Sequence, residues 1–135
     1  MTDPGCIFCK IAAGQAPSCR VYEDDHCFAF LDLAPFEEGH TLVIPKVHAP
    51  TLLDLPDDVL PHLLPAVRAV ARMLKERLRC DGFNVMQSNG ACATQVVPHV
   101  HFHVIPRWND HPAKWAPGSY AEPDGMRKVH ARLVG

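Results

Sequence analysis

The chain has 135 residues, of which 47% are hydrophobic and 21% charged, and its formal net charge is −2 at pH 7. This length suits a single domain with a modest core, and the weak charge excludes the basic surface of a typical nucleic-acid-binding protein. No apolar run approaches the roughly 20 residues that a membrane span needs. Residues 1–5 lack the basic and apolar regions of a signal peptide, so we expect a cytoplasmic protein.

The first third of the chain predicts a short helix followed by three strands. Residues 6–13 have helical character, and Gly14 stands where a helix commonly ends. Three runs rich in β-forming residues and bounded by turn residues then predict strands at 20–24, 27–33 and 40–46. Pro45 suits the end of the third strand, where no hydrogen-bond donor is required.

The remainder predicts one long helix and two more strands. Apolar residues recur with helical spacing between 57 and 79, at Leu60, Leu63, Leu64, Val67, Val70, Ala71, Leu74 and Leu78. Pro61 and Pro65 predict that the first turns are kinked or form a separate short piece. Further strands are expected at 82–88 and 98–107, and a tail without clear periodicity begins at about 108. Five strands with short connections and one long helix indicate an α+β fold with an antiparallel sheet.

Three histidines alternate with apolar residues in the last predicted strand. Because a strand has a period of two, His99, His101 and His103 should face one side of the sheet and the residues between them the core. Unpaired imidazoles rarely finish a sheet surface, so this pattern indicates function. Same-face neighbours lie roughly 6.6 Å apart along a strand, so two of the three could share one zinc but three hardly could. At least one imidazole therefore remains for nucleophilic or proton-transfer chemistry.

The run His-Val-His-Phe-His-Val-Ile at 99–105, followed by Pro-Arg, resembles the motif of the histidine triad (HIT) nucleotide-binding proteins, in the Hint-like branch of hydrolases. The resemblance implies a single HIT domain over 1–135, built on a five-stranded antiparallel sheet with one long helix and a short N-terminal helix. It also implies a homodimer. The implied activity is hydrolysis or nucleotidyl transfer at the α-phosphate of purine nucleotide derivatives, such as phosphoramidates or dinucleoside polyphosphates. His101 would form a covalent nucleotidyl-histidine that water then cleaves, without a catalytic metal.

Cys6 and Cys9 form a Cys-x-x-Cys pair near the N-terminus. In a reducing compartment the six cysteines should be thiols or metal ligands, and a redox role lacks the βαβ setting of thioredoxin-like proteins. A tetrahedral structural zinc would need two further ligands, which the resemblance assigns to His48 and His99. The alternative is two unbound thiols that pack the N-terminal helix.

The resemblance also assigns roles around the phosphate. His99 and His103 would position the nucleophile and the phosphate, and His40 would support the triad from behind. In the loop at 89–95, the groups that bond phosphate oxygens would belong to Asn89, Gly90 and Gln95.

The nucleoside would bind to residues of the first 33. Asp32 would accept hydrogen bonds from the two ribose hydroxyls, and otherwise it merely ends a strand and caps a turn. The base would be enclosed by apolar residues that otherwise belong simply to the core, namely Ile7, Phe8, Ile11, Phe30 and Leu33.

Three positions depart from the family pattern near Gln95. Thr94 replaces the usual glycine, Val96 replaces a Ser or Thr that could donate to the leaving group, and Ser88 replaces an asparagine. These changes bear on leaving-group preference more than on the chemistry. A rival function is a zinc-stabilised nucleotide-binding or partner-binding module with little turnover. A metallohydrolase is disfavoured because residues 98–107 contain no carboxylate to accompany the histidines.

Overall fold

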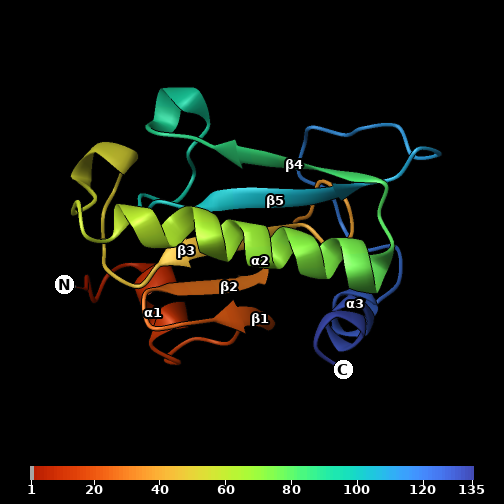
Figure 1. Cartoon of the computed structure of the whole chain (residues 1–135), viewed down its shortest axis with the longest axis horizontal. Helices are drawn as coiled ribbons and strands as arrows, with labels where there is room; N and C mark the ends of the chain where they lie inside the picture. Colours follow the sequence, from red (N-terminus) through yellow and green to blue (C-terminus); the bar gives the residue numbers. More distant parts are fainter. Residues whose placement is uncertain (1) are drawn as a thin grey trace.

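The computed structural model describes residues 2–135, which form one antiparallel sheet and three α-helices (Figure 1). The sheet order is β1-β2-β3-β5-β4, with strands β1 (Arg20–Glu23), β2 (Cys27–Leu31), β3 (Thr41–Pro45), β4 (Gly82–Gln87) and β5 (Phe102–Arg107). The helices are α1 (Ile7–Ala12), α2 (Leu60–Leu78) and α3 (Gly125–Val134). The α+β class, the five antiparallel strands, the long helix and the short N-terminal helix are all confirmed.

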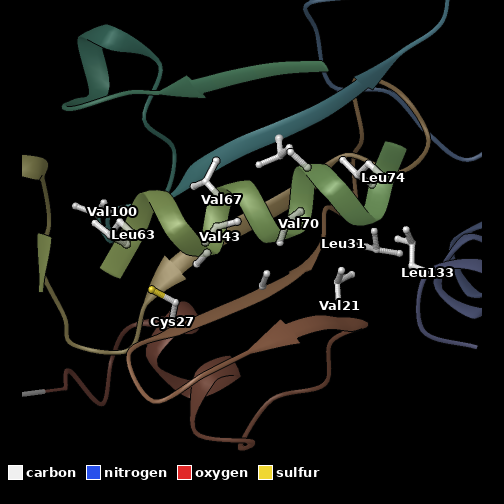
Figure 2. Packing of buried hydrophobic residues seen from close by; sticks show 14 of the residues in the cluster. Val21, Cys27, Leu31, Val43, Leu63, Val67, Val70, Leu74, Val100 and Leu133 are labelled. Carbon is white, nitrogen blue, oxygen red and sulfur yellow. The ribbon is translucent and has the colours of Figure 1, made fainter. Parts of the chain in front are cut away.

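The main hydrophobic core lies between α2 and one face of the sheet (Figure 2). Because side chains alternate across a strand, every second residue of β2 and β3 enters this core, including Cys27, Leu31 and Val43. The matching face of α2 is formed by Leu63, Ala66, Val67, Val70, Ala71, Leu74 and Leu78. Helix α3 packs beside α2 and β1 and adds Val129 and Leu133 to the same core.

A second, smaller cluster lies on the opposite face of the sheet and holds α1. The other alternating residues of β2 and β3 meet the helix there, and the cluster consists of Cys6, Phe8, Cys9, Ile11, Phe28, Phe30, Leu42 and Ile44. A helix of six residues is too short to be stable alone in water, so this packing keeps it folded. Gly14 follows with φ 75°, the left-handed conformation expected after a helix end.

The long helix differs in two respects from its prediction. It starts at Leu60 and runs unbroken to Leu78, so the separate short piece is wrong. Pro61 occupies the first turn, where its missing N–H is not needed, and Pro65 lies on the exposed face of the helix. Leu60 and Leu64 are 40% and 64% exposed, so neither belongs to the core.

The histidine strand is shorter than predicted. Strand β5 begins at Phe102, and the segment with His99 and His101 precedes it. Residue 100 donates its N–H to the carbonyl of Ala49 (2.8 Å), a loop residue, and not to β3. Strand β3 ends at Pro45, which lacks an N–H and gives its carbonyl to the ring of His99. Even so, Val100, Phe102 and Val104 contact the main core, and the histidines face away from it.

The C-terminal tail contains an element that the sequence reasoning missed. Helix α3 ends the chain, and its buried residues are Gly125, Val129 and Leu133. The weak apolar spacing across a largely polar segment hid it. Within residues 2–135, no helix is long and apolar enough to cross a membrane.

Candidate active site and metal centre

A cavity of about 710 Å³ opens on the sheet face opposite α2. It brings together His101, His103 and Asp32 with all five apolar residues proposed to enclose a base, which are Ile7, Phe8, Ile11, Phe30 and Leu33. Helix α1 and the end of β2 supply these apolar groups, so the sequence positions converge as expected. Leu33 lies at the mouth, where 79% of it is exposed.

His101 presents a basic ring nitrogen from a fixed ring. Its Nδ1 lies 2.8 Å from the carbonyl oxygen of His99, which can only accept, so Nδ1 carries the proton and Nε2 holds a lone pair. Burial lowers the pKa of His101, which keeps the ring neutral. The edge-to-face contact with Phe8, at 5.2 Å between ring centres, restrains the ring further. In this neutral tautomer, the Nε2 of His101 can act chemically as a nucleophile or as a base.

His40 and His103 form a directed chain of hydrogen bonds behind the site. The N–H of Phe36 donates to Nδ1 of His40 (3.0 Å), so the proton of His40 must be on Nε2. That Nε2–H donates to Nδ1 of His103 (2.8 Å), which leaves the proton of His103 on its own Nε2. Burial lowers the pKa of both rings to about 4, so both are neutral near pH 7. His103 thus offers an N–H donor where His101 offers a lone pair.

Asp32 holds a turn and also lines the cavity. One carboxylate oxygen, Oδ1, accepts the N–H of Ala34 (2.9 Å) and holds the turn after β2. The other, Oδ2, lies 3.6 Å from Nε2 of His40 and borders the cavity. Asp32, His40 and His103 are close enough to hold a metal ion, but the proton on Nε2 of His40 blocks that nitrogen as a ligand.

The predicted phosphate-binding residues lie in the loop between β4 and β5 and form hydrogen bonds within this loop and to the segment after β3. Gln95 accepts the N–H of Gly90 (2.6 Å) and donates to the carbonyls of Pro50 (2.6 Å) and Val97 (3.0 Å). Asn89 accepts the N–H of Leu52 (2.7 Å). Asn89, Gly90 and Gln95 do not border the cavity; their side chains and amides shape the loop. Thr94 has φ 70°, which explains why glycine is usual at that position.

Four side chains converge on a second centre beside α1. Nδ1 of His99 lies 3.3 Å from Sγ of Cys6 and 3.6 Å from Sγ of Cys9, and Nδ1 of His48 lies 3.5 Å from Sγ of Cys9. Sulfur and nitrogen ligands of one tetrahedral zinc lie about 3.6 Å apart, given bonds of about 2.3 and 2.1 Å. All four ligand atoms lie within 4.8 Å of one another. The donor set and its spacing fit zinc.

In both candidate histidine ligands, the second ring nitrogen, Nε2, lies near an oxygen atom of the protein. Nε2 of His99 donates to the carbonyl of Pro45 (2.8 Å), which leaves Nδ1 free to bind a metal. Nε2 of His48 lies 3.7 Å from a carboxylate oxygen of Asp3. Burial lowers the pKa of His99 to about 4 and raises the pKa of Cys9. All six cysteines are free of disulfides.

The sequence did not predict four of the residues that line the cavity as parts of a binding site. These are Met86, Val96, Trp115 and Pro117. The tail that carries Trp115 is fixed by the hydroxyl of Tyr120, which donates to the carbonyl of Asp32 (2.7 Å). The concentration of aromatic residues and prolines after Arg107 was the available signal, but it gave no position in space.

Comparison with known proteins gives consistent matches. Residues 13–110 match the HIT domain. Adenosine 5′-monophosphoramidase HNT1 of Saccharomyces cerevisiae is 39% identical over 135 aligned residues, which cover 98% of this chain and 82% of that protein. The crystal structure of a Hit-like protein from Bartonella henselae aligns with a TM-score of 0.87 at 37% identity, covering 98% of this chain and 96% of the other. A zinc-bound histidine triad family protein from Mycobacterium smegmatis aligns with a TM-score of 0.83 at 37% identity, covering 96% and 93%. With most of its length matched in sequence and in structure, this chain belongs to the HIT domain family.

Proposed function

We propose that the protein is a nucleotide hydrolase that cleaves the bond between the α-phosphorus of a purine nucleoside monophosphate and an attached leaving group, through a covalent nucleotidyl-histidine. The observation that carries the proposal is the tautomer of His101, whose Nδ1–H is held by a carbonyl, so that Nε2 keeps its lone pair on a ring that lines the cavity. The yeast relative is named an adenosine 5′-monophosphoramidase, and this name supports a P–N bond as the one broken.

The reaction needs two displacements at phosphorus. In the first, the lone pair of His101 Nε2 forms a bond to phosphorus, and the leaving nitrogen departs with the electron pair of the old P–N bond and takes a proton from solvent. In the second, water adds its oxygen to phosphorus and the electron pair of the new bond returns to Nε2. The net reaction consumes one water, whose oxygen ends on the nucleoside monophosphate and whose two protons end on the amine. No other reactant is required.

The neighbouring groups would bind the phosphate, the ribose and the base, and would hold the loop before β5 in place. The Nε2–H of His103, fixed by the donor chain from Phe36 through His40, would donate to a phosphoryl oxygen as charge develops there. Asp32 would accept hydrogen bonds from the ribose hydroxyls with its free oxygen, and the apolar residues of α1 and β2 would enclose the base. Gln95 would act by holding the loop, because both ends of its amide are already bonded.

Cys6, Cys9, His48 and His99 would hold a structural zinc ion, which the zinc-bound mycobacterial relative also supports. When bound, the ion would supply a cross-link between α1, the end of β3 and the segment before β5. No catalytic step passes through it.

The test is hydrolysis of adenosine 5′-phosphoramidate with and without a chelator. The His101→Ala variant should lose at least about a thousandfold in turnover yet still bind AMP. Denaturing mass spectrometry of protein quenched rapidly in base, where a phosphorus–imidazole bond survives, should find the adenylyl group on His101 only in the native chain. His26→Ala is the matched control, because His26 is exposed and outside the cavity. Turnover that stops on chelation would favour a metallohydrolase, and binding without turnover would favour the non-enzymatic module.

We further propose a homodimer that functions in the cytoplasm, where six free thiols are stable. Strand β4 is an outer strand of the sheet, and its Phe83 and Val85 are 44% and 45% exposed. Leu64 of α2 shares a second cavity, of about 340 Å³, with Phe83. Light scattering of the purified protein tests the oligomeric state, and a mass of one chain at micromolar concentration would refute it.

A further inference from the structure

Helix α1 connects the candidate metal centre to the candidate active site. Cys6 caps the N-terminus of the helix and Cys9 follows three residues later, and both belong to the group of candidate zinc ligands. Phe8, between the two cysteines, lines the cavity on the side proposed for the base. Its ring lies edge to face against the rings of His99 and His101. A change in how the two cysteines are held therefore changes a wall of the cavity.

The position of α1 depends on its tertiary contacts. The helix has six residues, too few for it to be stable alone in water. Those contacts are the small apolar cluster with β2 and β3 and the group of candidate zinc ligands. Two of the ligands, His48 and His99, lie in the segments after β3 and before β5. Without a metal ion that joins these segments, α1 is held by the apolar cluster.

The two sulfurs lie beneath a short segment of exposed chain. Cys6 and Cys9 are 8% and 4% exposed, whereas residues 2–5, which precede them, are all exposed. The N–H of Asp3 donates to Sγ of Cys9 (3.4 Å), and the carboxylate of Asp3 lies 3.7 Å from Nε2 of His48. A local opening of this terminal segment is enough to admit an oxidant as small as hydrogen peroxide.

The chain has four further cysteines, which are Cys19, Cys27, Cys80 and Cys92. Among residues 2–135, none of these four belongs to a group of candidate metal ligands, whereas Cys6 and Cys9 share one. Cys92 is exposed in the loop before β5 and provides a comparison thiol that any oxidant can reach.

We propose that Cys6 and Cys9 form a peroxide-sensitive pair, whose oxidation to a disulfide releases the zinc ion and weakens nucleotide binding. Metal ligation keeps both sulfurs as thiolates, the form that peroxides oxidise. One thiolate attacks a peroxide oxygen and the O–O bond breaks, which gives a sulfenic acid and hydroxide. The second thiolate attacks the sulfur of the sulfenic acid and displaces a second hydroxide. Each thiolate loses one electron, the peroxide gains two, and two protons from solvent convert the hydroxides to water.

Disulfide formation removes two of the four ligands in one event. Zinc binds thiolate sulfur, and a disulfide sulfur carries no negative charge. His48 and His99 remain, but two imidazoles do not complete the tetrahedral set of a structural zinc site. Loss of the cross-link lets α1 shift relative to the segment before β5, and Phe8 shifts with it. The side of the cavity proposed for the base then fits a nucleoside less well.

This inference rests on the nucleoside site of the proposed function and is independent of the covalent step. Zinc loss should raise KM and leave turnover at saturating substrate, which distinguishes this role from that of a catalytic metal. Because a coupling free energy between two sites is reciprocal, bound AMP should raise the affinity for zinc by the same factor by which zinc raises the affinity for AMP.

The experiment treats the zinc-loaded native chain with hydrogen peroxide and uses readouts that need no turnover. Zinc release is followed with the chromophoric chelator 4-(2-pyridylazo)resorcinol, and about one ion per chain should appear only after peroxide is added. The tryptic peptide that ends at Lys10 contains both cysteines and should lose the mass of two hydrogen atoms. The Kd of AMP, measured by calorimetry, should rise about fivefold or more, and dithiothreitol with added zinc should restore it.

Two variants accompany the native chain. Cys92→Ser is the matched control, because Cys92 is exposed and outside the group of ligands, and it should respond to peroxide as the native chain does. The Cys6→Ser, Cys9→Ser variant should bind AMP with the weaker Kd whether or not peroxide is added. If this variant does not fold, the native chain in its oxidised and re-reduced states provides the same comparison.

Zinc release with an unchanged Kd of AMP would overturn the inference, as would a chain that takes up no zinc or retains it after peroxide has oxidised Cys92. None of these results affects the proposed function, because hydrolysis of the phosphoramidate is measured separately. Redox-dependent binding of AMP without hydrolysis would support the inference and refute the hydrolase. A chain that binds no AMP in either state would refute both.

Discussion

The pair His40–His103 makes the stability of the protein sensitive to acid. His40 is completely buried, accepts the N–H of Phe36 and donates to His103, so the folded state requires its neutral form. Burial is the main cause that lowers the pKa of His40 to about 4 from its ordinary 6.5. Because the folded pKa is below the unfolded one, the stability is fully present well above pH 6.5. It falls as the pH decreases through 6.5, and the loss is complete below pH 4.

The size of the effect follows from these two pKa values. At pH 5 an unfolded His40 is almost fully protonated, whereas the folded one, with a pKa of about 4, remains mostly neutral. Proton linkage then lowers the free energy of unfolding by about 2 kcal/mol between pH 7 and pH 5 for His40 alone. That loss is a large part of the stability of a typical domain, roughly 5–15 kcal/mol.

The measurement is urea unfolding at pH 7 and pH 5 for the native chain and for His40→Gln. Glutamine can accept through its oxygen and donate through its nitrogen, but it does not titrate. The variant should be less stable at pH 7 and should lose about 2 kcal/mol less than the native chain on acidification. Titrating groups that do not contact His40, including those of the proposed zinc site, are common to both proteins and cancel, whereas His103, which bonds to His40, contributes to the difference. An identical pH dependence in the two proteins would refute the reasoning.

Three other perturbations test separate parts of the molecule. The Cys6→Ser, Cys9→Ser double variant should lose the zinc that elemental analysis is expected to find at about one per native chain, and should unfold at a lower temperature. Metal-free native protein with unchanged stability on zinc addition would refute that site. Asp32→Asn should weaken binding of AMP more than of 2′-deoxy-AMP by calorimetry, whereas equal loss would show that Asp32 only holds its turn. Gly90→Ala should lower the free energy of urea unfolding by about 2 kcal/mol, because φ 96° with ψ 150° is reserved for glycine and no neighbouring atom would be met; an unchanged midpoint would contradict this.

The hydrophobic periodicity of the sequence predicted those parts of the fold in which alternating residues of a strand pack against two different faces of the sheet. The alternation in β2 sends Cys27 and Leu31 to the main core and Phe28 and Phe30 to the cluster around α1. The alternation at the histidines predicted that His101 and His103 share one face, and both line the cavity even though His101 precedes the strand itself. A period of two requires only an extended chain, so it holds beyond the last ladder hydrogen bond.

Periodicity could not predict what tertiary contacts decide. The amide of Gln95 bonds to Val97 in its own loop and also to the carbonyl of Pro50 in the segment after β3, and nothing local in the sequence places Pro50 there. Trp115 reaches the cavity through a stack on Arg107 and a turn of the tail, neither of which has a repeating pattern. When two residues far apart in the sequence form a single contact, the sequence contains no repeating pattern from which that contact could be predicted.

His99 lies at both the candidate metal centre and the candidate active site, and different atoms of the residue face the two. Its ring faces the thiols of Cys6 and Cys9, while its backbone carbonyl fixes the tautomer of His101. Phe8, which lies between those cysteines in α1, contacts both imidazoles edge to face. Substitution of His99 would therefore disturb the ring and its environment together and could not separate structure from catalysis. The carbonyl belongs to the backbone and survives replacement of the cysteines, so the cysteine variants isolate the contribution of the metal from that of the nucleophile.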